Sequence, residues 1–305
     1  MISGAQGTLV PLGPPLSPLR PMFDARALRR FCFETARVAV GCLHTELVLY
    51  PKPGLVSLVD NGSHTDMTAM TFMRSLFALR HYFAQVCRAG FDDAPFASLK
   101  RLGIAAEARM IDATGGVNTH RGAIFSLGLL CAAVGRARAQ GVTPGADALR
   151  ALLLIRWGEE LAGHTRPGGS ASHGVQAAEA YAASGAREEA ALGMPSVFEV
   201  GLPAMRRTLA AGRGMHLARI DALFALMEHV SDTNVLYRGG AHGALTVKQQ
   251  ATGFLDLGGT AHPHWRAHAL ECHRILVEQK LSPGGAADLL AATCLVFSVS
   301  TGGRL

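Results

Sequence analysis

The sequence lacks the cysteine patterns of a zinc site or a disulfide framework. Its six cysteines are scattered through apolar, helix-like stretches, and none form a C-x-x-C pair. The N-terminal stretch also lacks a basic region followed by an apolar core, so we expect no signal peptide. No apolar run reaches the length that spans a membrane. These features predict buried free thiols in a reducing cytoplasm and no membrane partner.

Charge is also scarce. Charged residues make up only 17% of the chain, whereas hydrophobic residues reach 49%, a balance that is atypical of a disordered protein. The net charge is +6, but there is no block of consecutive basic residues and no interleaving of Lys or Arg with aromatic residues. This composition favours a small anionic ligand at least as much as RNA or DNA. With the rest of the sequence considered, we predict no nucleic-acid partner.

Strand-forming runs of Val, Ile, Thr and Tyr are rare, and Ala and Leu dominate, which favours helices. Asp24 is a good N-cap for a first helix that Pro51 ends, and a second helix is expected from about Ser63 to a stop at Gly90. Further helices are expected over about 95–113, 122–139, 145–163, 171–184, 187–212, 216–230, 241–253, 263–280 and 285–299. We predict an all-α fold: a disordered Pro/Gly-rich tail over 1–24 and a single helical domain over 25–305 with glycine-rich functional loops between helices.

The common nucleotide-binding motifs are missing, because the chain has neither G-x-x-x-x-G-K-S/T nor G-x-G-x-x-G. Polar residues gather instead in four glycine-containing loops. The candidates are Lys52, Asp60, His64 and Asp66 in the first loop, Asn118, His120 and Arg121 in the second, Asp232, Asn234, Arg238 and His242 in the third, and Ser282, Gly284, Gly285 and Asp288 in the fourth.

These loops have the composition of a polyanion site. Glycine at a helix N-terminus lets an anion approach the free N–H groups, and a nearby Arg or Lys adds charge-assisted hydrogen bonds. Carboxylates can hold the Mg²⁺ that accompanies a polyphosphate. Each loop taken singly is also explained by ordinary helix capping, as in Ser282-Pro283. The recurrence favours binding, since glycine in a first helical turn costs about 1 kcal/mol relative to alanine.

Five stretches of the chain resemble, in order and spacing, the triphosphoribosyl-dephospho-CoA synthase family. They are ELVLYPKPGLVSLVDNGSHTDM, GGVNTHRGAIFSLGLL, GAREEAALGMPSV, DTNVLYRGG and LSPGGAADLLAAT. The resemblance covers about residues 27 to 300. The contexts LVSLVDNGSH and LFALRHYF resemble the malonate decarboxylase branch more than the citrate lyase branch, which stays an alternative.

The resemblance implies a transferase that uses ATP and 3′-dephospho-CoA as substrates. The triphosphoribosyl group of ATP would join the 2′-hydroxyl of dephospho-CoA, with release of adenine. A separate transferase would then attach the derived prosthetic group to an acyl carrier protein. The change from a β bond in ATP to an α bond in the product implies one in-line attack, with a general base for the 2′-hydroxyl and protonation of adenine.

The resemblance also implies roles for individual residues. Contacts to nucleotide or phosphate are expected from Lys52, Asn118, His120, Arg121, Arg187, Asn234, Arg238, Gly284 and Gly285. Mg²⁺ is expected on carboxylates among Glu46, Asp66, Asp112, Asp232 and Asp288. The candidate catalytic residues, including the base, are Glu46, His64, Asp66 and Asp232.

Two positions depart from the family pattern: Glu188 stands where glycine is common, and Ser57 where aspartate is frequent. Glu188 could alter the substrate fit, and Ser57 is given no metal role. Two rival functions stay open, a Mg²⁺-dependent nucleotide N-glycosidase or hydrolase and a non-catalytic nucleotide-binding helical protein. The sequence does not fix the oligomeric state, and a homo-oligomer is one option.

Overall fold

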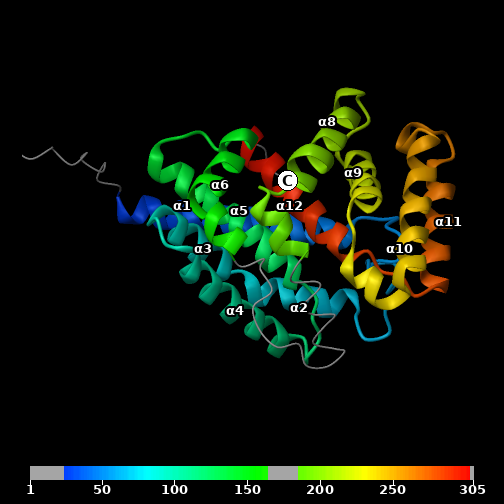
Figure 1. Cartoon of the computed structure of the whole chain (residues 1–305), viewed down its shortest axis with the longest axis horizontal. Coiled ribbons are helices and arrows are strands. Elements are labelled where there is room, and N and C mark those ends of the chain that lie inside the picture. Colours follow the sequence, from blue (N-terminus) through cyan, green and yellow to red (C-terminus); the bar gives the residue numbers. More distant parts are fainter. Residues whose placement is uncertain (1–23, 164–184, 303–305) are drawn as a thin grey trace, which may run out of the picture.

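The computed structural model describes residues 24–163 and 185–302, and within these ranges the chain is helical and has no strand. The elements, shown in Figure 1, are α1 (Ala25–Val48), α2 (Ala69–Leu79), α3 (Tyr82–Phe91), α4 (Phe96–Ala113), α5 (Arg121–Gln140), α6 (Ala146–Gly163), a helical stretch over 185–191, the π-helix η1 (Ser196–Gly201), α8 (Leu202–Ala210), α9 (Met215–His229), α10 (Thr233–Asp256), the 3-10 helix η2 (Gly259–Ala261), α11 (Trp265–Glu278) and α12 (Gly284–Thr301). The predicted all-α class is confirmed. Residues 1–23 of the predicted tail and the helix expected over 171–184 lie outside the described ranges.

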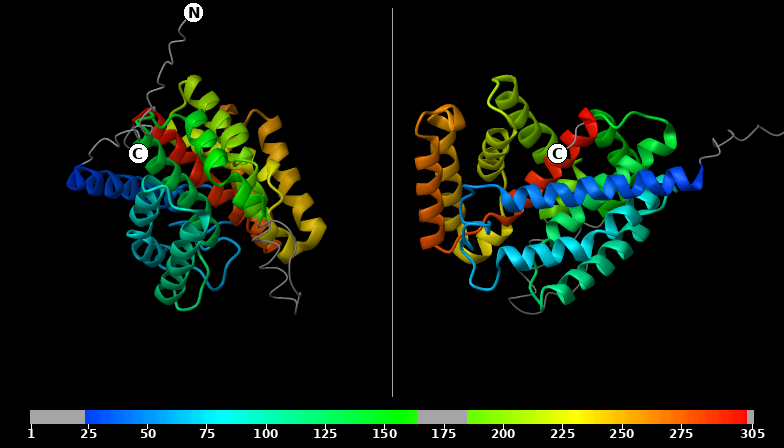
Figure 2. Two further views of the ribbon diagram at one scale, coloured as in Figure 1. Left: turned by 60° about the vertical axis from the view of Figure 1, so that its left-hand side comes forward. Right: turned by 180° about the vertical axis from the view of Figure 1, so that it is seen from behind.

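Helices α5 and α12 form the centre of the core. Helix α5 packs against α3, α4, α6 and α12, and α12 also packs against α1 and α9. Figure 2 shows α1 running along one side of the molecule towards α10 and α11, which stand at the end away from its N-terminus. Both α5 and α12 are long and apolar enough to cross a membrane, contrary to the expectation from the sequence. Most residues of each are buried among the other helices, as in the core helices of soluble proteins.

The packing of α3 on α5 depends on glycine. A Cβ atom at Gly90 would overlap the backbone of Ala132, and one at Gly135 would overlap the backbone of Cys87. The two helices therefore touch through their backbones. Gly90 was expected to stop a helix, and α3 does end one residue later, at Phe91. The lack of a side chain at Gly90 also permits this close contact.

Several predicted boundaries need correction. The second predicted helix is two helices, because α2 ends at Leu79 and α3 begins at Tyr82. The stretch predicted as one helix over 187–212 is divided into the 185–191 stretch, η1 and α8. The third functional loop is largely helical, since α10 begins at Thr233 and contains Gly240 as a non-helical kink with φ of 59°.

The long first loop, between α1 and α2, is confirmed as irregular backbone. It is attached to the turn between α11 and α12, where the Ser63 hydroxyl donates to the carbonyl oxygen of Leu281 at 2.6 Å. Gly54, with φ of +68°, lies so close to the Leu281 carbonyl that a Cβ there would overlap it. This contact places the first and fourth predicted loops side by side.

Candidate active site

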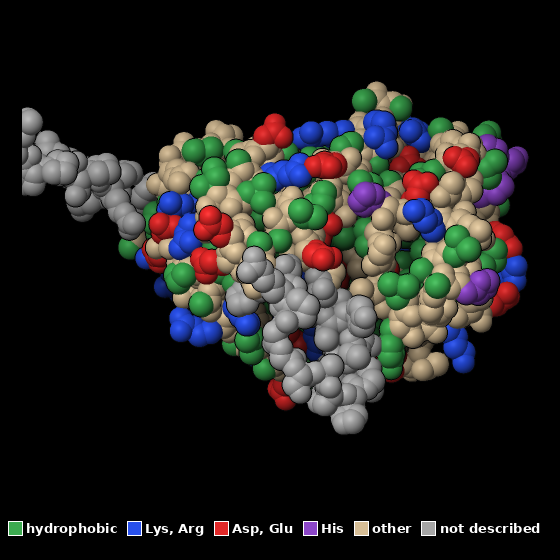
Figure 3. All heavy atoms as spheres, viewed as in Figure 1, with side chains coloured by type: hydrophobic (Ala, Val, Ile, Leu, Met, Phe, Trp, Pro, Cys, Tyr) green, Lys and Arg blue, Asp and Glu red, His purple; other side chains and the backbone are tan. Residues whose placement is uncertain are grey.

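One cavity of about 940 Å³ brings together all five of the stretches that carry the family resemblance. Its lining includes Lys52 and His64 from the first stretch and Arg187 from the third. The second stretch contributes most of its residues between Asn118 and Leu129, and the fourth and fifth stretches contribute further residues. The described lining holds seven Asp or Glu and five Lys or Arg side chains. On the face shown in Figure 3, acidic and basic side chains are likewise interspersed.

Asp232 joins two helix N-termini at the cavity. Its Oδ1 accepts hydrogen bonds from the N–H groups of Asn234 at 2.9 Å and Val235 at 3.4 Å, which caps α10. Its Oδ2 accepts from the N–H of Gly285 at 2.6 Å, in the first turn of α12. Burial raises the pKa of Asp232, although these backbone N–H groups oppose the shift. Both carboxylate oxygens are thus engaged in holding α10 and α12 together.

The glycines that begin α12 serve this cap. A Cβ on Gly285 would lie only 2.9 Å from Asp232 Oδ2, and one on Gly284 would lie 3.3 Å from Asn234 Nδ2. The N–H of Gly284 donates to the Ser282 carbonyl at 2.9 Å. The N–H groups of both glycines therefore have protein acceptors, so they are not free for a phosphate as the sequence argument expected.

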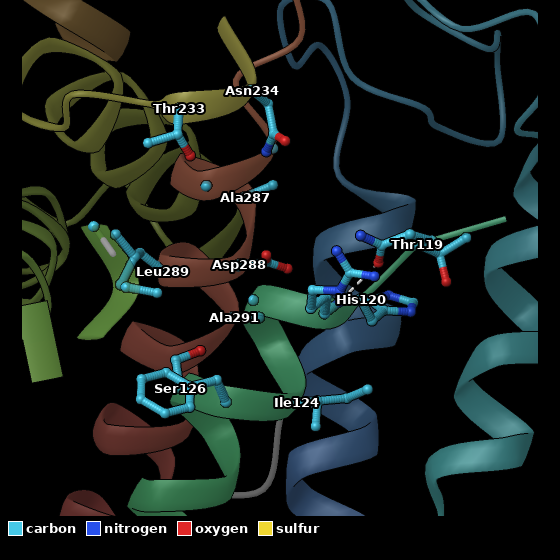
Figure 4. Close-up of a pocket in the computed structure, with 18 of the residues that line it drawn as sticks. Thr119, His120, Ile124, Ser126, Thr233, Asn234, Ala287, Asp288, Leu289 and Ala291 are labelled. Atoms are coloured by element: carbon cyan, nitrogen blue, oxygen red, sulfur yellow. Dashed lines mark hydrogen bonds between the residues drawn. The ribbon is translucent and has the colours of Figure 1, made fainter. Parts of the chain in front are cut away.

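Asp288 of α12 lies against the N-terminus of α5. It accepts a hydrogen bond from the N–H of Ala123, and its Oδ2 occupies the space that a Cβ on Gly122 would fill. Burial, followed by the charges of Glu46 and Asp232, raises the pKa of Asp288 well above its usual range. Figure 4 shows Asp288 between His120 on one side and Leu289 on the other.

Lys52 is fully buried and forms an ion pair. Its Nζ lies 2.5 Å from Glu46 Oε1 and also donates to the Glu46 carbonyl oxygen at 2.9 Å. Burial lowers the pKa of Lys52, and the charge of Glu46 opposes that shift. The predicted phosphate contact of Lys52 must compete with this pair, which compensates the buried charge of Glu46.

His64 is held by two partners. Its Nδ1 lies 3.2 Å from Nη2 of Arg238, and because a guanidinium has only donors, Nδ1 must accept that bond. Its Nε2 therefore carries the proton and donates to Ser282 Oγ at 2.8 Å. Burial and the Arg238 charge lower the pKa of His64. The basic lone pair of His64 is thus already occupied, which disfavours it as the general base.

His120 is buried at the start of α5. Its Nδ1 lies 2.6 Å from Ser75 Oγ, and its ring meets Phe72 edge to face with centroids 4.9 Å apart. Burial and then the Lys52 charge lower the pKa of His120 to about 3. At neutral pH the ring is uncharged, so it can form hydrogen bonds but adds no positive charge for a phosphate.

The other predicted residues are placed differently. Asn118, Arg121, Arg187, Asn234 and Arg238 all line the cavity. Arg121 Nε lies 2.6 Å from Glu107 Oε1, and the Asn118 side chain accepts from the Arg121 N–H. Asp66 lines the cavity with an exposed carboxylate.

Three predicted residues lie outside the described lining of the cavity: Asp60, Asp112 and His242. Asp112 is exposed near the end of α4, so the structure does not bring this candidate metal ligand to the site. Asp60 instead lies 3.4 Å from His273 Nε2.

Sequence reasoning missed several lining residues. Glu107 and Ser126 lie within helices, where their polar side chains resembled ordinary surface positions. Glu189 belongs to the third stretch and accepts from the Ser196 N–H and hydroxyl. Gly122 follows Arg121 directly, and a glycine inside a first helical turn was the available signal for a close approach.

Comparison with known proteins identifies the family. The family model described as CitG, ATP:dephospho-CoA triphosphoribosyl transferase, matches residues 32–304. A protein of Klebsiella pneumoniae named 2-(5''-triphosphoribosyl)-3'-dephosphocoenzyme-A synthase is 39% identical over 87% of this chain and 94% of its own length. Two further relatives are named as probable synthases of the same kind. The protein of Acinetobacter calcoaceticus is 38% identical over 86% of this chain and 89% of its own length. The protein of Pseudomonas fluorescens is 42% identical over 88% of this chain and 91% of its own length. No solved structure matches the chain. This chain therefore belongs to the ATP:dephospho-CoA triphosphoribosyl transferase family.

Proposed function

We propose that this protein transfers the triphosphoribosyl group of ATP to the 2′-hydroxyl of 3′-dephospho-CoA and releases adenine. The observation that carries the proposal is the meeting of the five family stretches, far apart in sequence, around one cavity. Arg187 and Arg238 line this cavity and supply positive charge for the phosphates of the substrates.

Glu46 is the carboxylate best placed to act as the general base for the 2′-hydroxyl. Of the four candidate catalytic residues, His64 has its lone pair on Arg238, and Asp232 has both oxygens on backbone N–H groups. Asp66 is exposed, with 58% of its side-chain surface accessible. Glu46 is buried in the cavity wall, and its contact with Lys52 uses Oε1, which leaves Oε2 for substrate.

The carboxylates of the cavity fit Mg²⁺ bound together with a polyphosphate. Among the described residues, no group of three or more ligating side chains could hold a metal ion by itself. Mg²⁺ usually binds through one or two carboxylates plus phosphate oxygens. Asp288 would hold the Mg²⁺ ion. Burial and the charges of Glu46 and Asp232 disfavour the negative charge of Asp288, and a bound cation would compensate that charge. The bound ion would neutralise charge on the triphosphate while ribose C1 loses its bond to adenine.

We also propose that the enzyme serves malonate decarboxylase in the cytoplasm and passes its product to a second transferase. The support is the sequence context of LVSLVDNGSH and LFALRHYF, together with six free cysteines that are all buried. Deletion of the gene in a host that carries both pathways tests the assignment. Loss of malonate decarboxylase activity with citrate lyase activity intact is expected, and the reverse pattern would overturn it.

The reaction itself is tested by following adenine from ATP with and without 3′-dephospho-CoA, in the presence of Mg²⁺ or EDTA. We expect adenine only when both dephospho-CoA and Mg²⁺ are present. Adenine formed without dephospho-CoA would identify a hydrolase instead. Well-folded protein that releases no adenine under any condition would favour a non-catalytic nucleotide-binding protein.

A further inference from the structure

Buried polar atoms without a partner are concentrated in one wall of the cavity. Within the described residues, five buried side-chain atoms lack a hydrogen bond. Three of them, on Thr119, His120 and Ser126, lie just before α5 or in its first two turns. All three residues line the cavity. Leaving a buried polar group unsatisfied costs about 1–3 kcal/mol, so such a cluster indicates that a ligand supplies the missing partners.

Two of these atoms lie on opposite sides of α5. His120 is 2% exposed and Ser126 is 7% exposed, so both side chains are buried. Ile124 follows His120 by four residues, so it marks the same side of α5. Ser126 is two residues after Ile124, which corresponds to a rotation of about 200° around the helix. Figure 4 shows Ile124 on the side of α5 towards α1 and Ser126 on the side towards α12. The cavity therefore extends along both sides of this helix.

Apolar cavity-lining side chains lie near both atoms. Phe72 meets the His120 ring edge to face, and Ile124 follows one turn later. On the other side, Leu129 follows Ser126 by three residues, and Figure 4 shows Leu289 of α12 on the same side as Ser126. An apolar wall with one unpartnered hydrogen-bonding atom is the pattern of a site for an uncharged ring system.

The chemistry of the two substrates requires a divided site. Both ATP and 3′-dephospho-CoA contain adenosine, and the new bond joins C1 of one ribose to the 2′-oxygen of the other. The two ribose rings must meet while the incoming adenosine stays clear of the departing adenine. Asp288 of α12 lies against the N-terminus of α5, between His120 on one side and Leu289 on the other.

We infer that the first turns of α5 separate two adenosine subsites, and that His120 binds the uncharged part of one substrate while Ser126 binds that of the other. This inference rests on the proposed function, because it takes both substrates from that reaction. It explains how one helical domain holds two adenosine-containing ligands at the same time.

Binding without turnover tests the division directly. The 2′-deoxy analogue of 3′-dephospho-CoA lacks the attacking hydroxyl, so it can be titrated calorimetrically into protein saturated with ATP and Mg²⁺. We expect one equivalent of analogue to bind with an affinity within about threefold of that for ATP-free protein. Competition, seen as a loss of analogue affinity in proportion to the ATP concentration, would overturn the inference.

Substitutions then show which substrate contacts the Ser126 hydroxyl and which contacts the His120 ring. With Ser126→Ala, the KM of one substrate should rise about tenfold, the effect of one lost hydrogen bond. With His120→Phe, the KM of the other substrate should rise by a similar factor. The inference fails if both substitutions raise the KM of the same substrate, or if they lower only kcat.

Ser298 provides a matched control for Ser126. It is a buried serine of α12 whose side chain forms a hydrogen bond with that of Cys42, and it lies outside the cavity lining. Ser298→Ala should lower the melting temperature and leave both KM values unchanged, whereas Ser126→Ala should not lower the melting temperature. If no product forms but both ligands still bind together, the reaction assignment fails and the two subsites stand.

Discussion

At the scale of single residues, the buried pair of Lys52 and Glu46 makes the fold sensitive to the loss of either partner. The side chains of both residues are almost fully buried, at 1% and 6% exposed, with Nζ and Oε1 2.5 Å apart. Removing one partner of such a pair leaves an uncompensated charge in a low-dielectric interior.

We expect Lys52→Met to lower the free energy of unfolding by about 3–5 kcal/mol. Urea denaturation followed by circular dichroism measures this change. Arg30→Met is the matched control, since Arg30 pairs with Glu34 on the surface and such pairs contribute less than about 1 kcal/mol. Equal effects of the two substitutions would contradict a structural role for the buried pair.

His120 makes stability depend on pH. In the unfolded chain this imidazole gains a proton near pH 6.5, whereas in the folded protein its pKa is about 3. The unfolded state therefore binds more protons between these values, so the stability contributed by neutral His120 is complete above pH 6.5 and is lost as the pH falls towards 3.

Between pH 7 and pH 4.5, the wild-type protein should lose about 2–3 kcal/mol more stability than His120→Gln, which cannot titrate. Urea denaturation of both proteins at the two pH values gives the comparison. The same loss in both proteins would show that His120 titrates normally in the fold.

The sequence pointed to many of the residues that line the candidate cavity. Of the residues predicted from the sequence, His64, Asp232, Asp288 and the arginines line one cavity. Their partners were beyond reach of the sequence, because a contact such as that between His64 and Ser282 joins positions 218 residues apart. The sequence could not show that Lys52 pairs with Glu46, or that Asp232 caps two helices.

At the scale of the elements, the helices were predictable and their junctions were not. Composition and caps such as Asp24 indicate where a helix forms, and that cap is confirmed by its bond to the Arg26 N–H at 2.9 Å. The kink at Gly240 has a φ of 59°, which glycine adopts readily, so the Gly239-Gly240 pair was an available signal that was not used. The break between α2 and α3 falls at Arg80-His81, where the local sequence contains no glycine or proline to mark it.

The approach of α12 to α5 depends on Gly122. Gly122→Ala should displace the Asp288 carboxylate and lower kcat at least about tenfold, while the protein stays folded. Steady-state kinetics with a melting curve measures both effects.

Gly253 is the matched control for this substitution. It lies in α10, and apart from its chain neighbours and the nearby backbone of its own helix, no atom lies within 4 Å of the position that a Cβ would take there. Gly253→Ala should therefore raise stability by about 0.5–1 kcal/mol without changing kcat. An unchanged kcat in Gly122→Ala would contradict the role assigned to the contact with Asp288.

At the scale of the whole molecule, one helical domain gathers five distant stretches around α5 and α12. Because α1, α10 and α12 meet beside the start of α5, Glu46, Asp232 and Asp288 come close together although they are spread along the chain. This convergence places more carboxylates than basic side chains around one cavity. We propose that the arginines, together with a divalent cation, bind the polyphosphate there.

The most direct test of this account is the mass of the product formed from ATP, Mg²⁺ and 3′-dephospho-CoA. The account predicts a single product whose mass equals that of dephospho-CoA joined to an intact triphosphoribosyl group, with one adenine released for each molecule formed. Dephospho-CoA recovered unchanged beside free ribose triphosphate would contradict it.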